Sequence, residues 1–204
     1  YDFGMRAVKS VLMMAGRLKM QEPDTKENIL LIRALRDSNV PKFVSFDVPL
    51  FQRIISDLFP GVNVPYVDYG KLQEAVKQSL TANKLIPVPS FVHKVIQVHE
   101  TMLVRHGMML VGECGSGKST NIHTLADALA NLQADGVTDV DNFFRRCDSF
   151  VLNPKSVTME EMYGNFNGLT QEWTDGLVAK LVREAAVAVD KNRKWVVFDG
   201  PVDT

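Results

Sequence analysis

The segment from Gly112 to Ser119 most constrains what this chain can fold into. It matches the pattern G-x-x-x-x-G-K-[ST] at every fixed position. Those positions are held by Gly112, Gly117, Lys118 and Ser119. The short apolar run Met108–Val111 before the segment predicts a buried strand, and a helix is predicted over residues 118–131. Strand, glycine-rich loop and helix in this order predict a parallel sheet with helices on its faces.

Each residue type in this loop suits the binding of a phosphate group. Glycines such as Gly115 let the backbone turn tightly, so that several N–H groups converge on one anion. Lys118 brings a compact positive charge to the β- and γ-phosphates, and the hydroxyl of Ser119 is a ligand for Mg²⁺. The positive end of the following helix faces the same anion. The loop therefore predicts a site for ATP or ADP with Mg²⁺; the alternative is a chance glycine-rich turn.

A second magnesium ligand is predicted after the apolar run Trp195–Phe198, where Asp199 follows a buried strand. Ligands bind at the carboxyl ends of strands in such sheets, and an aspartate there commonly holds Mg²⁺; a polar strand cap is the alternative. Together the residues predicted to contact the nucleotide or its metal are Gly112, Glu113, Cys114, Gly115, Ser116, Gly117, Lys118, Ser119, Thr120 and Asp199, with Ser119 and Asp199 as the magnesium ligands.

The residue after Asp199 bears on hydrolysis. Gly200 has no group that could orient or deprotonate a water molecule. Asp203 is the nearest following carboxylate and is the candidate substitute for the missing base. The sequence therefore favours binding without turnover, with hydrolysis assisted by Asp203 as the alternative.

Two sections differ in their hydrophobic periodicity and meet at Ile86–Pro89, where two prolines predict an extended segment. Residues 1–85 show helical spacing only, and residues 86–204 alternate strand and helix signals. The sequence thus predicts an α/β fold preceded by a small helical bundle, with strands at 150–152 and 195–198 and a helix at 177–190. Predicted inward positions are Val8, Val11, Leu12, Ala15, Leu18, Leu30, Leu31, Ala34, Leu35, Leu50, Phe51, Ile54, Ile55, Leu58, Leu72, Ala75, Val76 and Leu80.

Helix starts are predicted from capping residues. Asp24 lies three residues before Glu27, which resembles a capping box. Asp47 and Ser90 are predicted to cap the third helix and the helix that follows the boundary, which is expected to end at Gly107.

Composition and charge limit the classes of partner. The chain has 23 Lys+Arg and 24 Asp+Glu, so its net charge of −1 argues against nucleic-acid binding. No apolar run approaches the roughly 18 residues of a membrane span, so no membrane partner is expected. Two cysteines are too few for a disulfide framework, which predicts a reducing compartment such as the cytoplasm. The chain lacks an initial methionine and is interpreted as a piece of a longer protein.

Several strings of the chain resemble dynein heavy chains, and the resemblance covers essentially all 204 residues. Tyr1–Leu12, Leu31–Asp37 and Ile55–Gly61 are similar to the end of the first AAA+ module. Met102–Gly107, the glycine-rich loop and Trp195–Asp203 look like the start of the second. The strings between them that match the second module are Asn153–Ser156, Met162–Gly164 and Trp173–Gly176. Several strings are more similar to axonemal than to cytoplasmic chains.

The resemblance implies a microtubule motor with six AAA+ modules in a ring and a first module that is the main ATPase. It implies that residues 1–85 are the helical lid of that first module and 86–204 part of the α/β core of the second. Arg6 aligns with the lid arginine that senses nucleotide in the first module. Implied partners are neighbouring modules, microtubules and dynein intermediate and light chains, and the implied location is the cytoskeleton, in the axoneme of a cilium or flagellum.

Three functions follow from these observations. The leading hypothesis is an ATP-binding regulatory segment of a dynein motor that hydrolyses little or nothing at this site. The second is an active phosphoryl-transfer enzyme, either a hydrolysing AAA+ ATPase or another phosphate-loop phosphotransferase, against which Gly200 counts. The third is a structural interaction module with a decayed site, against which the intact loop and Asp199 count.

Overall fold

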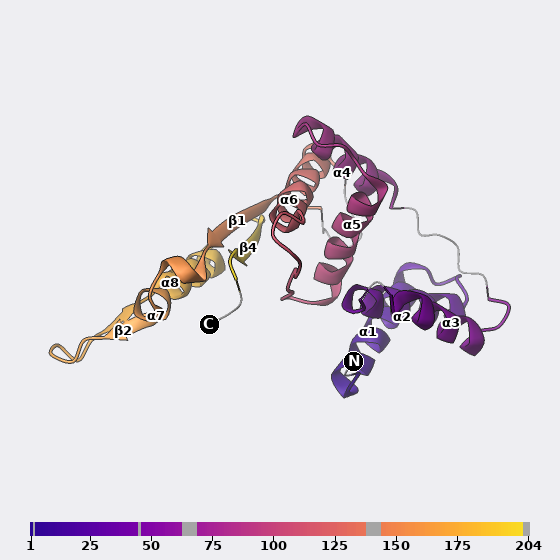
Figure 1. Ribbon diagram of the computed structural model, residues 1–204, viewed down its shortest axis with the longest axis horizontal. Coiled ribbons are helices and arrows are strands. Elements are labelled where there is room, and N and C mark those ends of the chain that lie inside the picture. Colours follow the sequence, from indigo (N-terminus) through magenta and orange to yellow (C-terminus); the bar gives the residue numbers. More distant parts are fainter. Residues whose placement is uncertain (2, 45, 63–68, 138–143, 202–204) are drawn as a thin grey trace. The chain divides into compact units, whose positions relative to one another are not determined.

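The computed structural model describes residues 1, 3–44, 46–62, 69–137 and 144–201. These residues divide into two compact units, Tyr1–Leu125 and Ala126–Thr204, with the division inside one helix. Figure 1 labels most of the elements. The helices that begin in the first unit are α1 (Met5–Gln21), α2 (Glu27–Asn39), η1 (Val40–Lys42), α3 (Val48–Leu58), α4 (Gly70–Ala82), α5 (Pro89–Val104) and α6 (Lys118–Ala134). The elements of the second unit are β1 (Cys147–Leu152), η2 (Pro154–Ser156), α7 (Met159–Tyr163), β2 (Gly164–Phe166), β3 (Trp173–Asp175), α8 (Leu177–Val187) and β4 (Arg193–Phe198).

The first two helices pack along one apolar stripe. The cluster between them consists of the buried side chains Val11, Met14, Leu18, Leu30 and Ala34, against which Ala15, Leu31 and Leu35 pack. On α1 the predicted positions Val11, Ala15 and Leu18 are confirmed. Val8 and Leu12 were wrong, because they are 47% and 62% exposed, and the buried Met14 was not predicted. Spacings of three and four residues through Met14 give a tighter helical stripe than the predicted set.

The fourth helix confirms its predicted face, and the third does not. All four predicted core residues of α4 are buried, namely Leu72, Ala75, Val76 and Leu80. On α3 Ile55 is buried and Phe51 half-buried, whereas Leu50, Ile54 and Leu58 are 59%, 48% and 66% exposed. The spacing of apolar residues defines a face, but burial of that face requires a neighbouring element to cover it.

The predicted capping residues were largely wrong. Helix α2 begins at Glu27 with Lys26 at the N-cap, and α5 begins at Pro89 with Val88 at the N-cap. Asp47 does occupy the N-cap of α3, but its side chain makes no cap bond and accepts a hydrogen bond from the Tyr1 hydroxyl at 2.7 Å. A cap is worth only about 1 kcal/mol, and the fixed φ of a proline at the first helical position competes with it.

The segment Met108–Val111 is not a strand, which corrects the prediction from its apolar sequence. Met109 and Val111 are 78% and 84% exposed. A strand needs a partner for its backbone hydrogen bonds, and none of the strands described pairs with these residues. The helix after the loop was predicted correctly and extends three residues further, to Ala134.

The second unit contains the parallel pair that the sequence predicted. Strands β1 and β4 are in register from Cys147 opposite Arg193 to Leu152 opposite Phe198. Both are longer than predicted, whereas α8 ends at Val187, short of the predicted 190. Strands β2 and β3 form an antiparallel hairpin that the sequence analysis did not predict. Helices with a small parallel sheet are consistent with an α/β AAA+ fold.

The extended link between the two predicted sections is present. Residues 85–88 have no helical or strand conformation, and Ile86 is 82% exposed. Helix α4 before the link nevertheless packs on α5 after it. The assignment of residues 1–85 and 86–204 to different modules stays a prediction. Among the residues described, no helix is both long and apolar enough to span a membrane.

Candidate functional site

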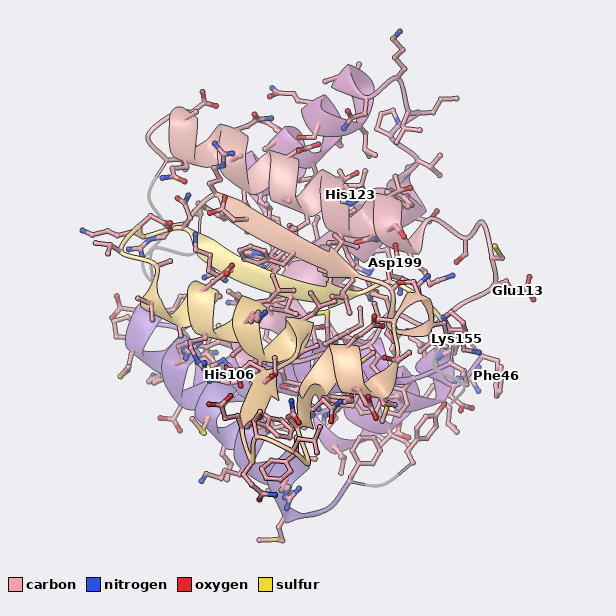
Figure 2. The ribbon with its side chains drawn as sticks, turned by 90° about the vertical axis from the view of Figure 1, so that its left-hand side faces the viewer. Phe46, His106, Glu113, His123, Lys155 and Asp199 are labelled. Carbon is pink, nitrogen blue, oxygen red and sulfur yellow. The ribbon has the colours of Figure 1, made fainter. Side chains whose placement is uncertain are left out.

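The glycine-rich loop lies between the extended Met108–Val111 segment and the first residue of α6, which is Lys118. Gly115 and Gly117 have φ angles of 79° and 82°, in the left-handed region that other residues rarely adopt. Glu113 lies on the loop as it projects from the N-terminal end of α6 (Figure 2). Two of the three loop glycines are thus required by backbone conformation, as the motif predicts.

The ammonium group of Lys118 folds back onto its own loop. Its Nζ donates hydrogen bonds to the carbonyl oxygens of Gly112 at 2.9 Å and Glu113 at 2.7 Å. The Ser116 amide also donates to the Glu113 carbonyl at 3.2 Å, which closes a turn within the loop. These contacts hold one positive charge where the loop and the positive end of α6 meet, which is an arrangement suited to an anion.

The remaining loop residues differ in exposure. Glu113, Cys114, Gly115 and Ser116 are exposed, and Cys114 is a free thiol. Ser119 and Thr120 are half-buried in the first turn of α6. An anion in the loop would therefore meet backbone amides and Lys118 on the protein side and solvent on the other.

Asp199 follows the last residue of β4, as the sequence predicted, and its side chain is exposed (Figure 2). Its amide donates to the Leu152 carbonyl at 2.9 Å, so the parallel ladder fixes its backbone. The carboxylate is held at the carboxyl end of two adjacent parallel strands, where ligands of α/β sheets bind.

Position 200 is sterically restricted, which sequence reasoning missed. A Cβ atom added to Gly200 would lie 2.7 Å from Oδ1 of Asn153, closer than real Cβ contacts. The same oxygen accepts a hydrogen bond from the Lys155 amide at 3.0 Å, as the N-cap of η2. A side chain at position 200 would have to displace this capping group, and no local sequence signal connects the two residues.

The loop and Asp199 belong to different compact units. The joint magnesium site of Ser119 and Asp199 therefore stays a prediction. Among residues 1, 3–44, 46–62, 69–137 and 144–201, no group of three His, Cys, Asp or Glu side chains is placed to hold a metal ion. Arg6 is exposed on the first turns of α1, and Asp203, the candidate substitute base, lies outside the described residues.

Helices α2 and α5 carry the most perturbed carboxyl groups of the first unit. Burial raises the pKa of Glu100 to about 8, and the nearby Asp37 carboxyl contributes to this increase. Burial also raises the pKa of Asp37 to about 6, against the opposing effect of Arg33 and Arg36. These groups lie away from the glycine-rich loop in sequence, and the motif gave no indication of them.

Comparison with known proteins identifies the family. Residues 1–119 match a family model described as the hydrolytic ATP binding site of the dynein motor region. Over the whole chain the identity is 54% to dynein axonemal heavy chain 6 of Homo sapiens and 48% to dynein axonemal heavy chain 12 of Mus musculus. It is 49% to dynein axonemal heavy chain 3 of Mus musculus. The chain spans only 5% to 6% of the length of these relatives. The chain belongs to the dynein heavy chain family and carries ATP-binding sequence of its motor region.

Proposed function

We propose that this chain binds ATP or ADP with Mg²⁺ at Gly112–Ser119. The observation that carries the proposal is the loop itself: two left-handed glycines and the Lys118 ammonium group lie together at the start of α6. Backbone amides and Lys118 would hold the phosphates, and the Ser119 hydroxyl and Asp199 carboxylate would hold the metal. Mg²⁺ would neutralise charge on the β- and γ-phosphates when bound.

The site belongs to a phosphate-loop NTPase fold of the AAA+ type. On this proposal residues 1–85 are the helical lid of one module and residues 86–204 are part of the α/β core of the next. The exposed link at 85–88, which has no helical or strand conformation, supports this division. The lid then reports on the preceding module's nucleotide, with Arg6 as its sensing residue.

The proposed role is structural or regulatory, with little or no hydrolysis at this site. Gly200 offers no group to orient water. A Cβ atom at this position would lie only 2.7 Å from Oδ1 of Asn153. Bound nucleotide would then favour those conformational states of the parent motor that it binds more tightly.

A hydrolysing module is the second candidate. One observation favours it, because the matched family model is described as a hydrolytic site. That match ends at residue 119 and does not include Asp199 or Gly200, so it does not bear on the strand end where a base would lie.

The names of the relatives support a wider proposal. The parent chain would be an axonemal dynein that works on microtubules in a cilium or flagellum, as part of the cytoskeleton. Neighbouring modules of the same chain and dynein intermediate and light chains would be its partners, with no role for nucleic acid or membrane.

The test of binding is a titration with fluorescent ATP. Lys118→Ala removes a charge-assisted contact worth about 1.5–3 kcal/mol, so the Kd should rise about ten- to hundredfold. Lys77→Ala removes an exposed positive charge from α4 and is the matched control, with an expected Kd equal to that of the wild type. Equal affinity for the wild type and Lys118→Ala would refute the site.

The test of hydrolysis is a single-turnover assay in the intact heavy chain, with the phosphate-loop lysine of the first module replaced. We expect phosphate release at this site to be slower than at a module that has a general base. The expected factor is the 10²–10⁴-fold that such a base typically contributes. Rapid release that disappears on Lys118→Ala would establish the hydrolysing alternative.

A further inference from the structure

An aromatic side chain on α5 lies directly against the glycine-rich loop. A Cβ atom added to Gly117 would lie 3.0 Å from Cε2 of Phe91, 3.8 Å from Cζ and 3.9 Å from Cδ2. All three atoms belong to one edge of the same ring. The ring therefore covers Gly117 on the side where an L-amino acid would carry its side chain.

This contact connects an exposed loop to a buried helix. The loop residues 112–116 are exposed, whereas Gly117 and Phe91 are half-buried. Helix α5 is anchored on the inside by Val92, Val95 and Ile96, which are 2%, 0% and 2% exposed. The position of the Phe91 ring is thus set by a packed helix.

Gly117 is the residue at which the loop enters α6. Its φ of 82° directs the chain into the helix, and its carbonyl accepts the first helical hydrogen bond from the Asn121 amide at 2.9 Å. A change in this conformation would redirect the amides on either side of it. Glycine visits many backbone conformations, so a fixed left-handed state benefits from a contact that restricts it.

We propose that Phe91 is a positioning residue for nucleotide binding, whose ring holds Gly117 in the conformation that aligns the loop amides on phosphate. The proposal rests on the nucleotide site proposed above. Phe91 acts through the loop and does not touch the base or ribose of the nucleotide. Phe91 should therefore affect the affinity for every ligand that carries a polyphosphate, whether or not the ligand has a nucleoside.

The experiment measures affinity in the 204-residue chain for two probes, fluorescent ATP and inorganic tripolyphosphate. Phe91→Ala should weaken both probes by the same factor, about tenfold, which is about 1.4 kcal/mol. Phe91→Leu should recover most of the affinity, because a leucine can still contact Gly117. Weaker binding of ATP alone would mean that Phe91 contacts the nucleoside, and the proposal would be wrong.

Val92→Ala is the matched control for a merely structural role. Val92 is the adjacent residue of α5 and is buried. It provides none of the three atoms nearest to a Cβ at Gly117. Its truncation should lower the thermal stability of the first unit and leave both affinities within about twofold of the wild type. Equal losses of affinity in Val92→Ala and Phe91→Ala would overturn the positioning role.

A double-mutant cycle tests the contact itself. Gly117→Ala introduces both backbone strain and a clash with the Phe91 ring. In the double variant, Phe91→Ala relieves that clash and leaves the backbone strain. The loss of affinity on Gly117→Ala should therefore be several-fold smaller in the Phe91→Ala background. Additive losses would contradict the proposal. If the wild type bound neither probe, the nucleotide site itself would be refuted, which is a separate outcome.

Discussion

Replacement of Glu100 by glutamine should remove a pH dependence from the stability of the first unit. Glu100 is 9% exposed in α5, and burial raises the pKa of its carboxyl from 4.5 to about 8. The Asp37 carboxyl contributes to this increase, and the Arg33 guanidinium opposes it. The folded chain therefore keeps the proton on Glu100 at neutral pH, whereas the unfolded chain releases it.

The sign of the effect follows from proton linkage. Between the unfolded pKa of 4.5 and the folded pKa of about 8, unfolding releases the proton of Glu100. The stability that this proton contributes is therefore fully present below pH 4.5 and is lost as the pH rises through about 8. Asp37, with a folded pKa of about 6, contributes to the lower part of this window. Between about pH 6.5 and 8 the loss comes mainly from Glu100 and should be roughly 2 kcal/mol.

Hydrogen exchange of the α5 amides, corrected for intrinsic exchange, measures the free energy of opening of this unit. Wild-type protein should lose roughly 2 kcal/mol across that window, and Glu100→Gln less than about 0.5 kcal/mol. Glu27→Gln removes an exposed carboxylate from α2 and is the control. Its free energy of opening should fall across this pH range by as much as that of the wild type. A loss in Glu100→Gln equal to that of the wild type would refute the reasoning.

Three further predictions concern the hairpin, the lid and the link. Gly164→Ala should destabilise the second unit by about 1–3 kcal/mol, because Gly164 has φ 126° and an added Cβ would lie 2.5 Å from the Trp173 ring. Gly168→Ala, where the Cβ meets nothing within 4 Å, is its control in thermal unfolding followed by circular dichroism. Arg6→Ala in the intact heavy chain should alter turnover at the preceding module and leave ATP binding at the glycine-rich loop unchanged; weaker binding there would contradict this. Limited proteolysis should cut first at the exposed link of residues 85–88, and mass spectrometry of the fragments would show any other first site.

The backbone conformation of the candidate site could be predicted from the sequence. Gly115 and Gly117 are left-handed because the loop motif requires a turn that glycine permits. The α4 face was predicted in full, because a stripe of apolar residues at helical spacing is buried wherever a neighbour covers it. Asp199 at the end of β4 followed from the apolar run before it. Each of these features depends on residues close together in the chain.

The errors have a common origin. Asp24 and Ser90 have the side chains of helix caps, but the helices begin at Glu27 and Pro89, because cap energies are small and other local preferences compete with them. Met108–Val111 has the composition of a strand and pairs with none of the strands described. Strand formation is decided by a partner, which the segment itself cannot specify.

The sequence by itself determined the family, the phosphate-loop motif and the two strands that pair in parallel in the second section. Only the tertiary structure decided that Phe91 lies on Gly117, that Asn153 occupies the space beside Gly200 and that Glu100 is buried near Asp37. The physical reason is that motifs and periodicity encode local backbone conformation. Contacts between segments distant in the chain depend on how whole elements pack, and no short stretch of sequence contains that information.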